Sequence, residues 1–324
     1  MASPHPHTFF LRRGNAINRT VLVLMAAGAS LSYSLGSISE GLADPARSVV
    51  LWCGIATALF SLGLFYARFV EPSWIVVTRK KVHVRGIHGL RIAVVGDFHV
   101  GPHKQARFVE RAVATVNALR PDLVLLVGDF LFDHASDVSH VAPLKGLRAP
   151  LGVFAVLGNH DSGAHGKHAT PTEHDRSDDV VNFLTPLGVT FLRNRSVAVE
   201  FRGHHVRVAG TDDVWMKTHD LAEALADIPA DTPTILLTHN ADTVLDAAAH
   251  RADLVVSGHT HGGQVRLPFY GSLTALPQKL NKKFDRGLFP LSDTCTLAIT
   301  HGIGETFLPL RFFARPEVLL LETR

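Results

Sequence analysis

Two long stretches near the amino terminus contain no charged side chain. They cover residues 20–39 and 49–67, and each is about as long as the roughly 20 residues that a helix needs to cross a bilayer. The second stretch is more uniformly apolar, because the first contains several serines. We therefore expect two transmembrane helices with a short connecting loop within residues 20–70.

The charges around these stretches are distributed unevenly. Arg12, Arg13 and Arg19 precede the first stretch, and a basic cluster at 79–81 follows the second, whereas the loop between them holds two acidic residues and one arginine. Lys and Arg are enriched on the cytoplasmic side of membrane helices. The pattern predicts a helical hairpin with residues 1–19 as a cytoplasmic tail and with the large C-terminal part in the cytoplasm.

An alternative for the first stretch is a signal peptide that is cleaved after Ala43. The second stretch would then be a membrane span on its own, and the orientation of the C-terminal part would stay open. A twin-arginine export signal at Arg12 and Arg13 fits less well, because Gly14 and Asn15 follow where apolar residues are needed.

Five short apolar runs in the rest of the chain share one form. Each is rich in Val, Leu or Ile without polar alternation, which is typical of strands buried on both faces. Each is followed closely by an acidic, amide or imidazole side chain. The runs occupy residues 92–95, 123–127, 153–157, 235–237 and 254–256.

Segments with helical spacing separate some of these runs. Residues 104–119 lie between the first two runs and residues 241–250 between the last two. Strands that alternate with helices pair in parallel and are joined by right-handed crossovers. Ligands of such sheets gather outside the carboxyl ends of the strands, so the polar side chains that follow the runs should meet in one crevice.

The side chains expected in that crevice are two carboxylates, one amide and five imidazoles. They are Asp97, His99, Asp129, Asn159, His160, His239, His259 and His261. Burying two carboxylates together is costly unless cations compensate them. Nitrogen and oxygen donors without thiolates suit Mn²⁺, Fe or Zn²⁺, and the donors suffice for two ions that share a carboxylate. Such a pair activates water for attack on phosphorus.

Composition changes this picture little. The 324 residues include 20 histidines and carry a net charge of only +3, so no global field argues for nucleic acid. The two cysteines, Cys53 and Cys295, form neither a disulfide framework nor a Cys metal pattern. After a link at 71–73, residues 74–324 read as one domain.

The ordered motifs resemble those of the calcineurin-like metallophosphoesterases, from about Leu90 to the C-terminus. They are Asp97-x-His99, Gly128-Asp129, Gly158-Asn159-His160-Asp161, His239 and Gly258-His259-Thr260-His261. Their extended forms and the ending Leu308-Pro309-Leu310-Arg311 are similar to the bacterial membrane-associated branch of YkuE/YaeI-type phosphodiesterases. The resemblance implies an α/β fold, a four-layer α-β-β-α sandwich, here preceded by the transmembrane hairpin in the bacterial inner membrane.

The resemblance also implies a role for each motif residue. One divalent ion would be held by Asp97, His99, Asp129 and His261. The second would be held by Asp129, Asn159, His239 and His259. Mn²⁺ is the preferred metal, with Fe or Zn²⁺ as alternatives. His160 would protonate the leaving alkoxide or stabilise charge on the phosphoryl group, and Asp161 would orient the imidazole of His160.

The expected function is hydrolysis of a phosphodiester, phosphomonoester or pyrophosphate by metal-bound hydroxide. The membrane anchor favours a lipid-linked substrate such as a UDP-acylated sugar. One alternative is a nuclease of the same superfamily, but the sequence shows no basic groove of the size that DNA needs, and no nucleic-acid partner is expected. The other is a non-catalytic scaffold, although such relatives have usually lost ligands that are all present here.

The remaining polar clusters have plainer interpretations. His165, His168 and His174 are expected in a solvated loop, and His204 and His205 in a hairpin turn. A second basic cluster follows the last motif, and we interpret it as a solvated loop, with binding of substrate phosphate as the alternative. This cluster consists of Lys279, Lys282, Lys283 and Arg286.

Overall fold

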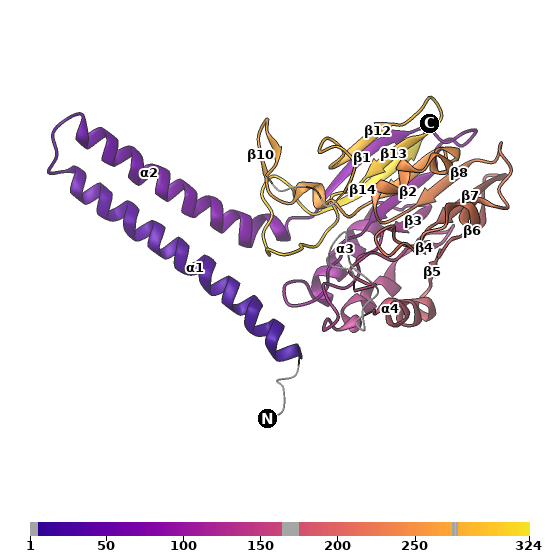
Figure 1. Cartoon of the computed structure of the whole chain (residues 1–324), viewed down its shortest axis with the longest axis horizontal. Helices are drawn as coiled ribbons and strands as arrows, with labels where there is room; N and C mark the ends of the chain where they lie inside the picture. Colours follow the sequence, from indigo (N-terminus) through magenta and orange to yellow (C-terminus); the bar gives the residue numbers. More distant parts are fainter. Residues whose placement is uncertain (1–5, 164–174, 274–275, 277) are drawn as a thin grey trace.

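The computed structural model describes residues 6–163, 175–273, 276 and 278–324. The predicted loop with His165, His168 and His174 lies outside these residues. Two long helices extend to one side of a globular domain, and the described strands all lie in that domain (Figure 1).

The two helices confirm the predicted apolar pair. Helix α1 covers Pro6–Ser39 and α2 covers Ala46–Phe65, and a π-helical turn (Tyr66–Val70) and a 3₁₀ turn (Glu71–Ser73) lead from α2 into the domain. Both helices are long and apolar enough to cross a membrane, and large apolar side chains such as Trp52 face outward. Helix α1 begins well before Thr20, so most of the predicted N-terminal tail is helical.

Two six-stranded sheets form the centre of the domain. In the first sheet the order is β1-β14-β2-β3-β4-β5, and β2 to β5 run parallel. Its strands are β1 (Val76–Val82), β14 (Glu317–Thr323), β2 (Arg91–Val95), β3 (Leu123–Leu126), β4 (Val153–Ala155) and β5 (Val189–Phe191). In the second sheet the order is β12-β13-β9-β8-β7-β6, with β7, β8, β9 and β13 parallel. Its strands are β12 (Gly287–Pro290), β13 (Thr296–Ile299), β9 (Leu254–Ser257), β8 (Thr234–Leu237), β7 (His204–Gly210) and β6 (Arg195–Phe201).

Each sheet is covered on both faces, which explains the apolar runs without alternation. Along β3, Leu123 and Leu125 pack against the second sheet, whereas Val124 and Leu126 pack on the helical side. Helices α3 (Ala106–Ala118) and α4 (Ser177–Leu184) cover the first sheet, and α5 (Leu221–Leu225) covers the second. Because successive side chains point to opposite faces, both faces demand apolar residues. The result is the predicted four-layer sandwich.

Two local predictions need correction. The segment 241–250, read as helical, forms two 3₁₀ helices (Ala241–Leu245 and Ala247–Arg251), because Asn240 and Asp246 each accept a hydrogen bond from a backbone N–H two residues on and start a new turn. The hairpin turn lies at Arg202 and Gly203, not at His204 and His205, which begin β7. Both turn residues have positive φ, as the tight turns of two-residue hairpins require.

Arg311 joins the π-helical turn after α2 to the domain. Its backbone N–H donates to Ala67 O at 2.9 Å, and its fully buried guanidinium donates to carbonyls such as Ala314 O at 2.6 Å. The guanidinium also lies 3.5 Å from the carboxylate of Glu305. The carboxylate of Glu71, at the end of the helical segment, accepts from the backbone N–H of Phe313 at 3.0 Å. The end of the helical segment is thus fixed to the loop at 302–315.

Replacing Arg311 by Met should lower the free energy of unfolding by about 3–5 kcal/mol, because the buried carbonyls lose their donor and the Glu305 carboxylate keeps only Lys104 as a counter-charge. Arg315→Met is the matched control, since the Arg315 side chain is only partly buried and stacks on Trp74 at 3.7 Å. Chemical denaturation of the full chain in detergent measures both. Equal losses for the two variants would contradict the structural role of Arg311.

Candidate metal centre

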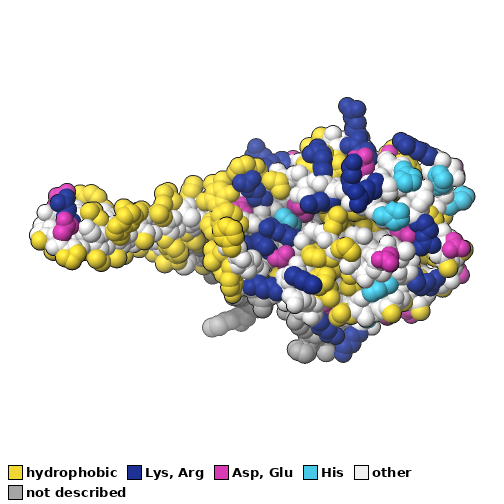
Figure 2. Space-filling view, turned by 90° about the horizontal axis from the view of Figure 1, so that it is seen from above, with side chains coloured by type: hydrophobic (Ala, Val, Ile, Leu, Met, Phe, Trp, Pro, Cys, Tyr) yellow, Lys and Arg dark blue, Asp and Glu magenta, His cyan; other side chains and the backbone are white. Residues whose placement is uncertain are grey.

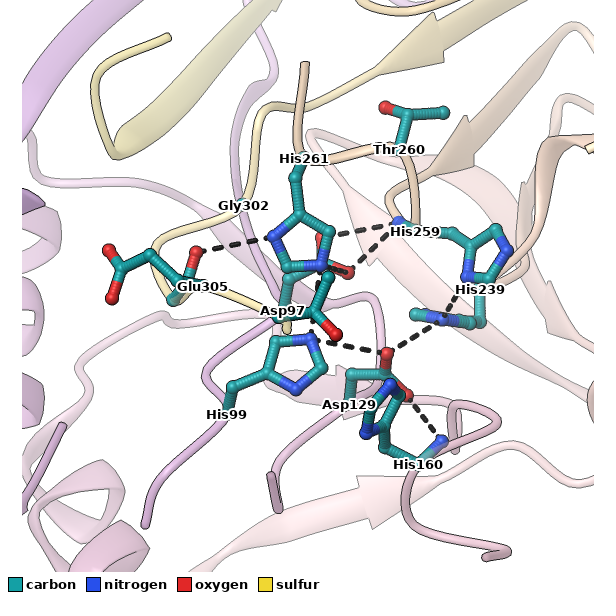
Figure 3. A network of polar contacts seen from close by, with 12 residues as sticks. Asp97, His99, Asp129, His160, His239, His259, Thr260, His261, Gly302 and Glu305 are labelled. Carbon is teal, nitrogen blue, oxygen red and sulfur yellow. Dashed lines mark hydrogen bonds and ion pairs between the residues drawn. The ribbon is translucent and has the colours of Figure 1, made fainter. Parts of the chain in front are cut away.

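The predicted site residues meet at the carboxyl ends of strands from both sheets. Asp97 and His99 follow β2, and Asp129 follows β3. Asn159 and His160 follow β4. From the second sheet, His239 follows β8, and His259 and His261 follow β9. Figure 3 shows their labelled side chains pointing toward a common centre. The structure therefore brings together every residue predicted for the crevice.

A first group of donor atoms surrounds His261. Its Nε2 lies 3.1 Å from Nε2 of His99 and 3.7 Å from Oδ1 of Asp97. The Nε2 of His99 lies 3.4 Å from Oδ2 of Asp129. All four side chains are buried.

A second group surrounds His239. Its Nε2 lies 3.0 Å from Nδ1 of His259 and 3.2 Å from Oδ1 of Asn159. The same Nε2 lies 3.2 Å from Oδ2 of Asp129. One carboxylate oxygen of Asp129 therefore belongs to both groups.

Backbone carbonyls hold several of the imidazoles in place. Nδ1 of His239 donates to Val127 O at 2.6 Å, and Nδ1 of His261 donates to Gly304 O at 3.2 Å. A proton on Nδ1 leaves the lone pair on Nε2, which then faces the centre. This is the usual second contact of metal-binding histidines.

The spacing of the donor atoms fits divalent cations. Ligands about 2.1 Å from a metal ion lie roughly 3.0–3.4 Å from one another in octahedral or tetrahedral geometry. Except for the 3.7 Å between His261 and Asp97, the distances within the two groups fall between 3.0 and 3.4 Å. Opposed imidazole lone pairs repel one another unless a proton or a cation lies between them. The donor set therefore suits two ions on either side of Asp129.

The backbone at the site adopts an unusual conformation. Five non-glycine residues there have positive φ, a conformation that costs about 1 kcal/mol or more for each residue. They are Asp97, His99, Asp129, His259 and His261. Adjacent glycines permit the close approach: a Cβ on Gly158 would lie 2.1 Å from Oδ1 of Asp129, and one on Gly258 would lie 2.6 Å from Oδ2 of Asp97. Such strain is typical of functional sites.

The buried carboxylates of the site require positive charge nearby. Burial raises the pKa of Asp97 to about 7, and the nearby carboxylate of Asp129 adds to this rise. Burial alone would raise the pKa of Asp129, but the imidazoles of His239 and His160 outweigh it and hold that pKa well below its usual range. Burial would lower the pKa of His239, but Asp129 reverses this and raises it to about 10. In the metal-free protein, a proton on His239 thus compensates the carboxylates.

Metal binding should therefore release protons. Because the pKa of His239 is about 10, an ion in the second group must displace its proton at neutral pH. The apparent affinity should fall about tenfold for each unit by which the pH is lowered, and more steeply below about pH 7, where Asp97 also becomes protonated. Titration calorimetry in two buffers of different ionisation enthalpy measures the released protons, and heats that do not depend on the buffer would contradict this prediction.

Asp161 has different partners from those expected. Its Oδ1 accepts from the backbone N–H of Leu131 at 3.0 Å and its Oδ2 from that of Gly158 at 2.9 Å. The imidazole of His160 instead donates from Nδ1 to Phe132 O at 2.7 Å. The short Asp161 carboxylate ties the β4 loop to the β3 loop, and the Phe132 carbonyl orients His160.

Sequence reasoning missed Asp213, which follows β7 at the same edge. This carboxylate is buried, and Oδ1 accepts from Trp215 N at 2.7 Å, while Oδ2 has no hydrogen-bond partner among the described residues. Burial raises the pKa of Asp213 to about 6, and the ring of Trp215 packs edge-on against His259 at 4.7 Å. The signal is the segment 206–213, in which Val206, Val208 and Ala209 precede Gly-Thr-Asp-Asp, but Arg207 interrupts the apolar residues there.

Comparison with known proteins adds independent findings. Residues 90–263 match the model of the calcineurin-like phosphoesterase family. The uncharacterized metallophosphoesterase YkuE of Bacillus subtilis is 31% identical over 79% of this chain and 88% of its own length. The UDP-2,3-diacylglucosamine pyrophosphatase LpxG of Chlamydia muridarum is 27% identical over 79% of this chain and 91% of its own. The phosphodiesterase YaeI of Escherichia coli is 28% identical over 82% of this chain and 95% of its own.

Proposed function

The chain belongs to the calcineurin-like phosphoesterase family of metal-dependent phosphoric ester hydrolases, and from this premise we propose that it hydrolyses a phosphodiester, phosphomonoester or pyrophosphate in a lipid-linked substrate. The observation that carries the proposal is the double group of donor atoms around Asp129, in a domain fixed directly to the end of the second of two apolar helices.

We assign the ions to the two groups of donor atoms. The first position consists of Asp97, His99, Asp129 and His261. The second consists of Asp129, Asn159, His239 and His259. When bound, two such ions supply Lewis acidity for a phosphoryl oxygen and for the attacking water. Mn²⁺ is our preferred metal, with Fe or Zn²⁺ as alternatives, because the set mixes oxygen and nitrogen donors without thiolate.

His160 is the proposed proton donor to the leaving group. Its backbone N–H donates to Oδ1 of Asp129 at 2.9 Å, which fixes its position beside the two groups. Its Nδ1 donates to Phe132 O, so Nε2 is the atom that exchanges protons with substrate. Unlike the proposed ligands, His160 is partly exposed, as a residue that meets substrate must be. The Phe132 carbonyl is its positioning partner.

Two named relatives support the class of substrate. LpxG is named for a pyrophosphate bond in a diacylated UDP-sugar, and YaeI is named as a phosphodiesterase. The helices α1 and α2 support attachment to a membrane. We propose that residues 20–70 form a two-helix anchor in the bacterial inner membrane. Residues 1–19 and the domain at 74–324 then lie in the cytoplasm, because basic residues flank both helices.

The proposal is tested by hydrolysis assays on the full chain in detergent. Bis-p-nitrophenyl phosphate, p-nitrophenyl phosphate and a UDP-diacylated sugar should be compared with Mn²⁺, Zn²⁺ and chelator. Hydrolysis that needs the metal and is greatest for the acylated substrate supports the proposal. Protein that binds two ions and hydrolyses none of the three compounds contradicts it.

A further inference from the structure

A group of apolar side chains is exposed on two loops of the domain. One loop is the hairpin of β10 (Arg266–Leu267) and β11 (Gly271–Ser272) with the residue that follows it, and the other covers residues 306–313. Their exposed apolar side chains, which we call the apolar patch, are Phe269, Tyr270, Leu273, Phe307, Leu308 and Phe313. Phe269 is fully exposed, and Phe307 is 79% exposed. Clustered exposure of this kind marks a binding surface.

The apolar patch adjoins the membrane end of the domain. The backbone N–H of Arg266 in β10 donates to Phe312 O at 2.9 Å, which ties the two loops together. The ring of Phe312 lies 6.3 Å from that of Tyr66, in the π-helical turn that continues α2. In Figure 1, where the long axis of the molecule is horizontal, β10 lies at the same position along this axis as the last turns of α2. Figure 2 shows apolar side chains continuing from the helices onto this end of the domain, beside Lys and Arg side chains.

A basic pocket of about 640 Å³ opens beside the apolar patch. The pocket is lined by the β10–β11 hairpin and by Lys282, Lys283 and Arg286. Asp285 also lines it, and its carboxylate is paired with Arg266. The ammonium of Lys282 lies 4.3 Å from the ring centre of Tyr270, and Arg286 donates from Nη1 to Phe313 O at 3.2 Å. The first contact places positive charge against an exposed aromatic ring, and the second places it at the backbone of Phe313, a residue of the apolar patch.

Aromatic rings beside Lys and Arg suit the boundary between the headgroups and acyl chains of a bilayer. We propose that the apolar patch enters the interface of the membrane that α1 and α2 cross, and that the basic pocket binds the phosphate of an anionic phospholipid. The site lies outside the metal centre and does not depend on the proposed catalysis. It also gives the basic cluster a function, where the sequence alone favoured a solvated loop.

The proposed surface is connected to the metal centre by the loop that follows β9. Arg266 donates from Nη1 to Gly262 O at 3.0 Å, next to His261. A Cβ on Gly263 would lie 2.5 Å from Cβ of Ser272, so β11 packs directly on the same loop. Binding of lipid at the hairpin would therefore hold the loop with His259 and His261 close to the membrane surface, within reach of a substrate anchored there.

Spin labels on the full chain in lipid nanodiscs test the depth of the patch. In a Cys53→Ser, Cys295→Ala background, one label is attached through Phe269→Cys and a control label through the exposed His205→Cys in β7. Strand β7 lies on the side of the domain away from the two long helices (Figure 1). In phosphatidylcholine–phosphatidylglycerol discs, the ratio of accessibility to oxygen over a water-soluble nickel chelate should be several-fold higher at position 269. Equal ratios at the two positions would overturn the proposal.

A second comparison tests the basic pocket. The ratio of accessibility to oxygen over the nickel chelate at position 269 should fall several-fold in the double variant Lys282→Glu with Lys283→Glu. It should fall similarly for the unchanged chain in discs of phosphatidylcholine alone. The control variant Arg202→Glu with Arg324→Glu makes the same charge change at exposed positions that do not line the pocket. It should leave the accessibility ratio at position 269 unchanged. The assignment of the pocket to phospholipid would be overturned if the accessibility ratio at position 269 were the same in every disc and variant. It would also be overturned if inorganic phosphate lowered this ratio as much as loss of the anionic lipid does.

Discussion

Asp129→Asn is expected to remove divalent metal from both positions and to lower phosphoester turnover by about a thousandfold or more. The Oδ2 atom of Asp129 lies 3.4 Å from Nε2 of His99 and 3.2 Å from Nε2 of His239, so it serves both groups of donors. An amide keeps the shape but loses the charge that holds two cations together. A loss of about 4 kcal/mol of transition-state stabilisation corresponds to about a thousandfold in rate.

The matched control is Asp122→Asn, at the opposite end of the same strand. Its Oδ2 accepts from the backbone N–H of Arg91 at 2.8 Å, far from the imidazoles. Metal analysis and initial rates should show the wild-type metal content and turnover for this variant. If Asp129→Asn also kept two ions and normal turnover, Asp129 would not be the shared ligand.

His160→Gln is expected to lower kcat by about 10²–10⁴-fold, the usual contribution of a general acid, without loss of metal. The loss should be much smaller for a p-nitrophenolate leaving group, which needs no proton, than for an alkoxide. This split arises because Nε2 acts on the leaving oxygen while the Phe132 carbonyl fixes the ring. Rates with paired aryl and alkyl phosphodiesters measure it.

The geometry also defines the competing interpretation of His160. Its imidazole lies in a third group with His99 and Asp129, whose donor atoms are within 4.8 Å of one another. If His160→Gln lost an ion while the control His205→Gln kept both, His160 would be a ligand. Equal losses for aryl and alkyl leaving groups, with metal retained, would instead indicate stabilisation of charge on the phosphoryl group.

The sequence predicted the strands and the crevice because the physical signal was strong. A strand covered on both faces has a continuous apolar sequence, as at 123–127. The turn that follows it lies at the edge of the sheet and carries a polar side chain such as that of Asp129. The same logic applied to β7, but the alternating start of that strand, with exposed His204 and His205, concealed its buried end and hence Asp213.

Other features left no signal in the sequence. The partner that orients His160 is a backbone carbonyl, and every residue carries one, so side-chain identity pointed to Asp161 instead. The burial of Arg311 depends on carbonyls from residues 301–314 that become neighbours only when the loop folds. Long-range packing of this kind determines how the membrane helix meets the domain, and no local pattern encodes it.

The central claim is that two cations share Asp129, and anomalous diffraction from crystals of the full chain grown with Mn²⁺ tests it most directly. The account predicts two anomalous peaks about 3.5–4 Å apart, one beside His99 and His261 and the other beside His239, His259 and Asn159, with Oδ2 of Asp129 between them. A single peak, or two peaks of which one lies outside these side chains, would contradict it.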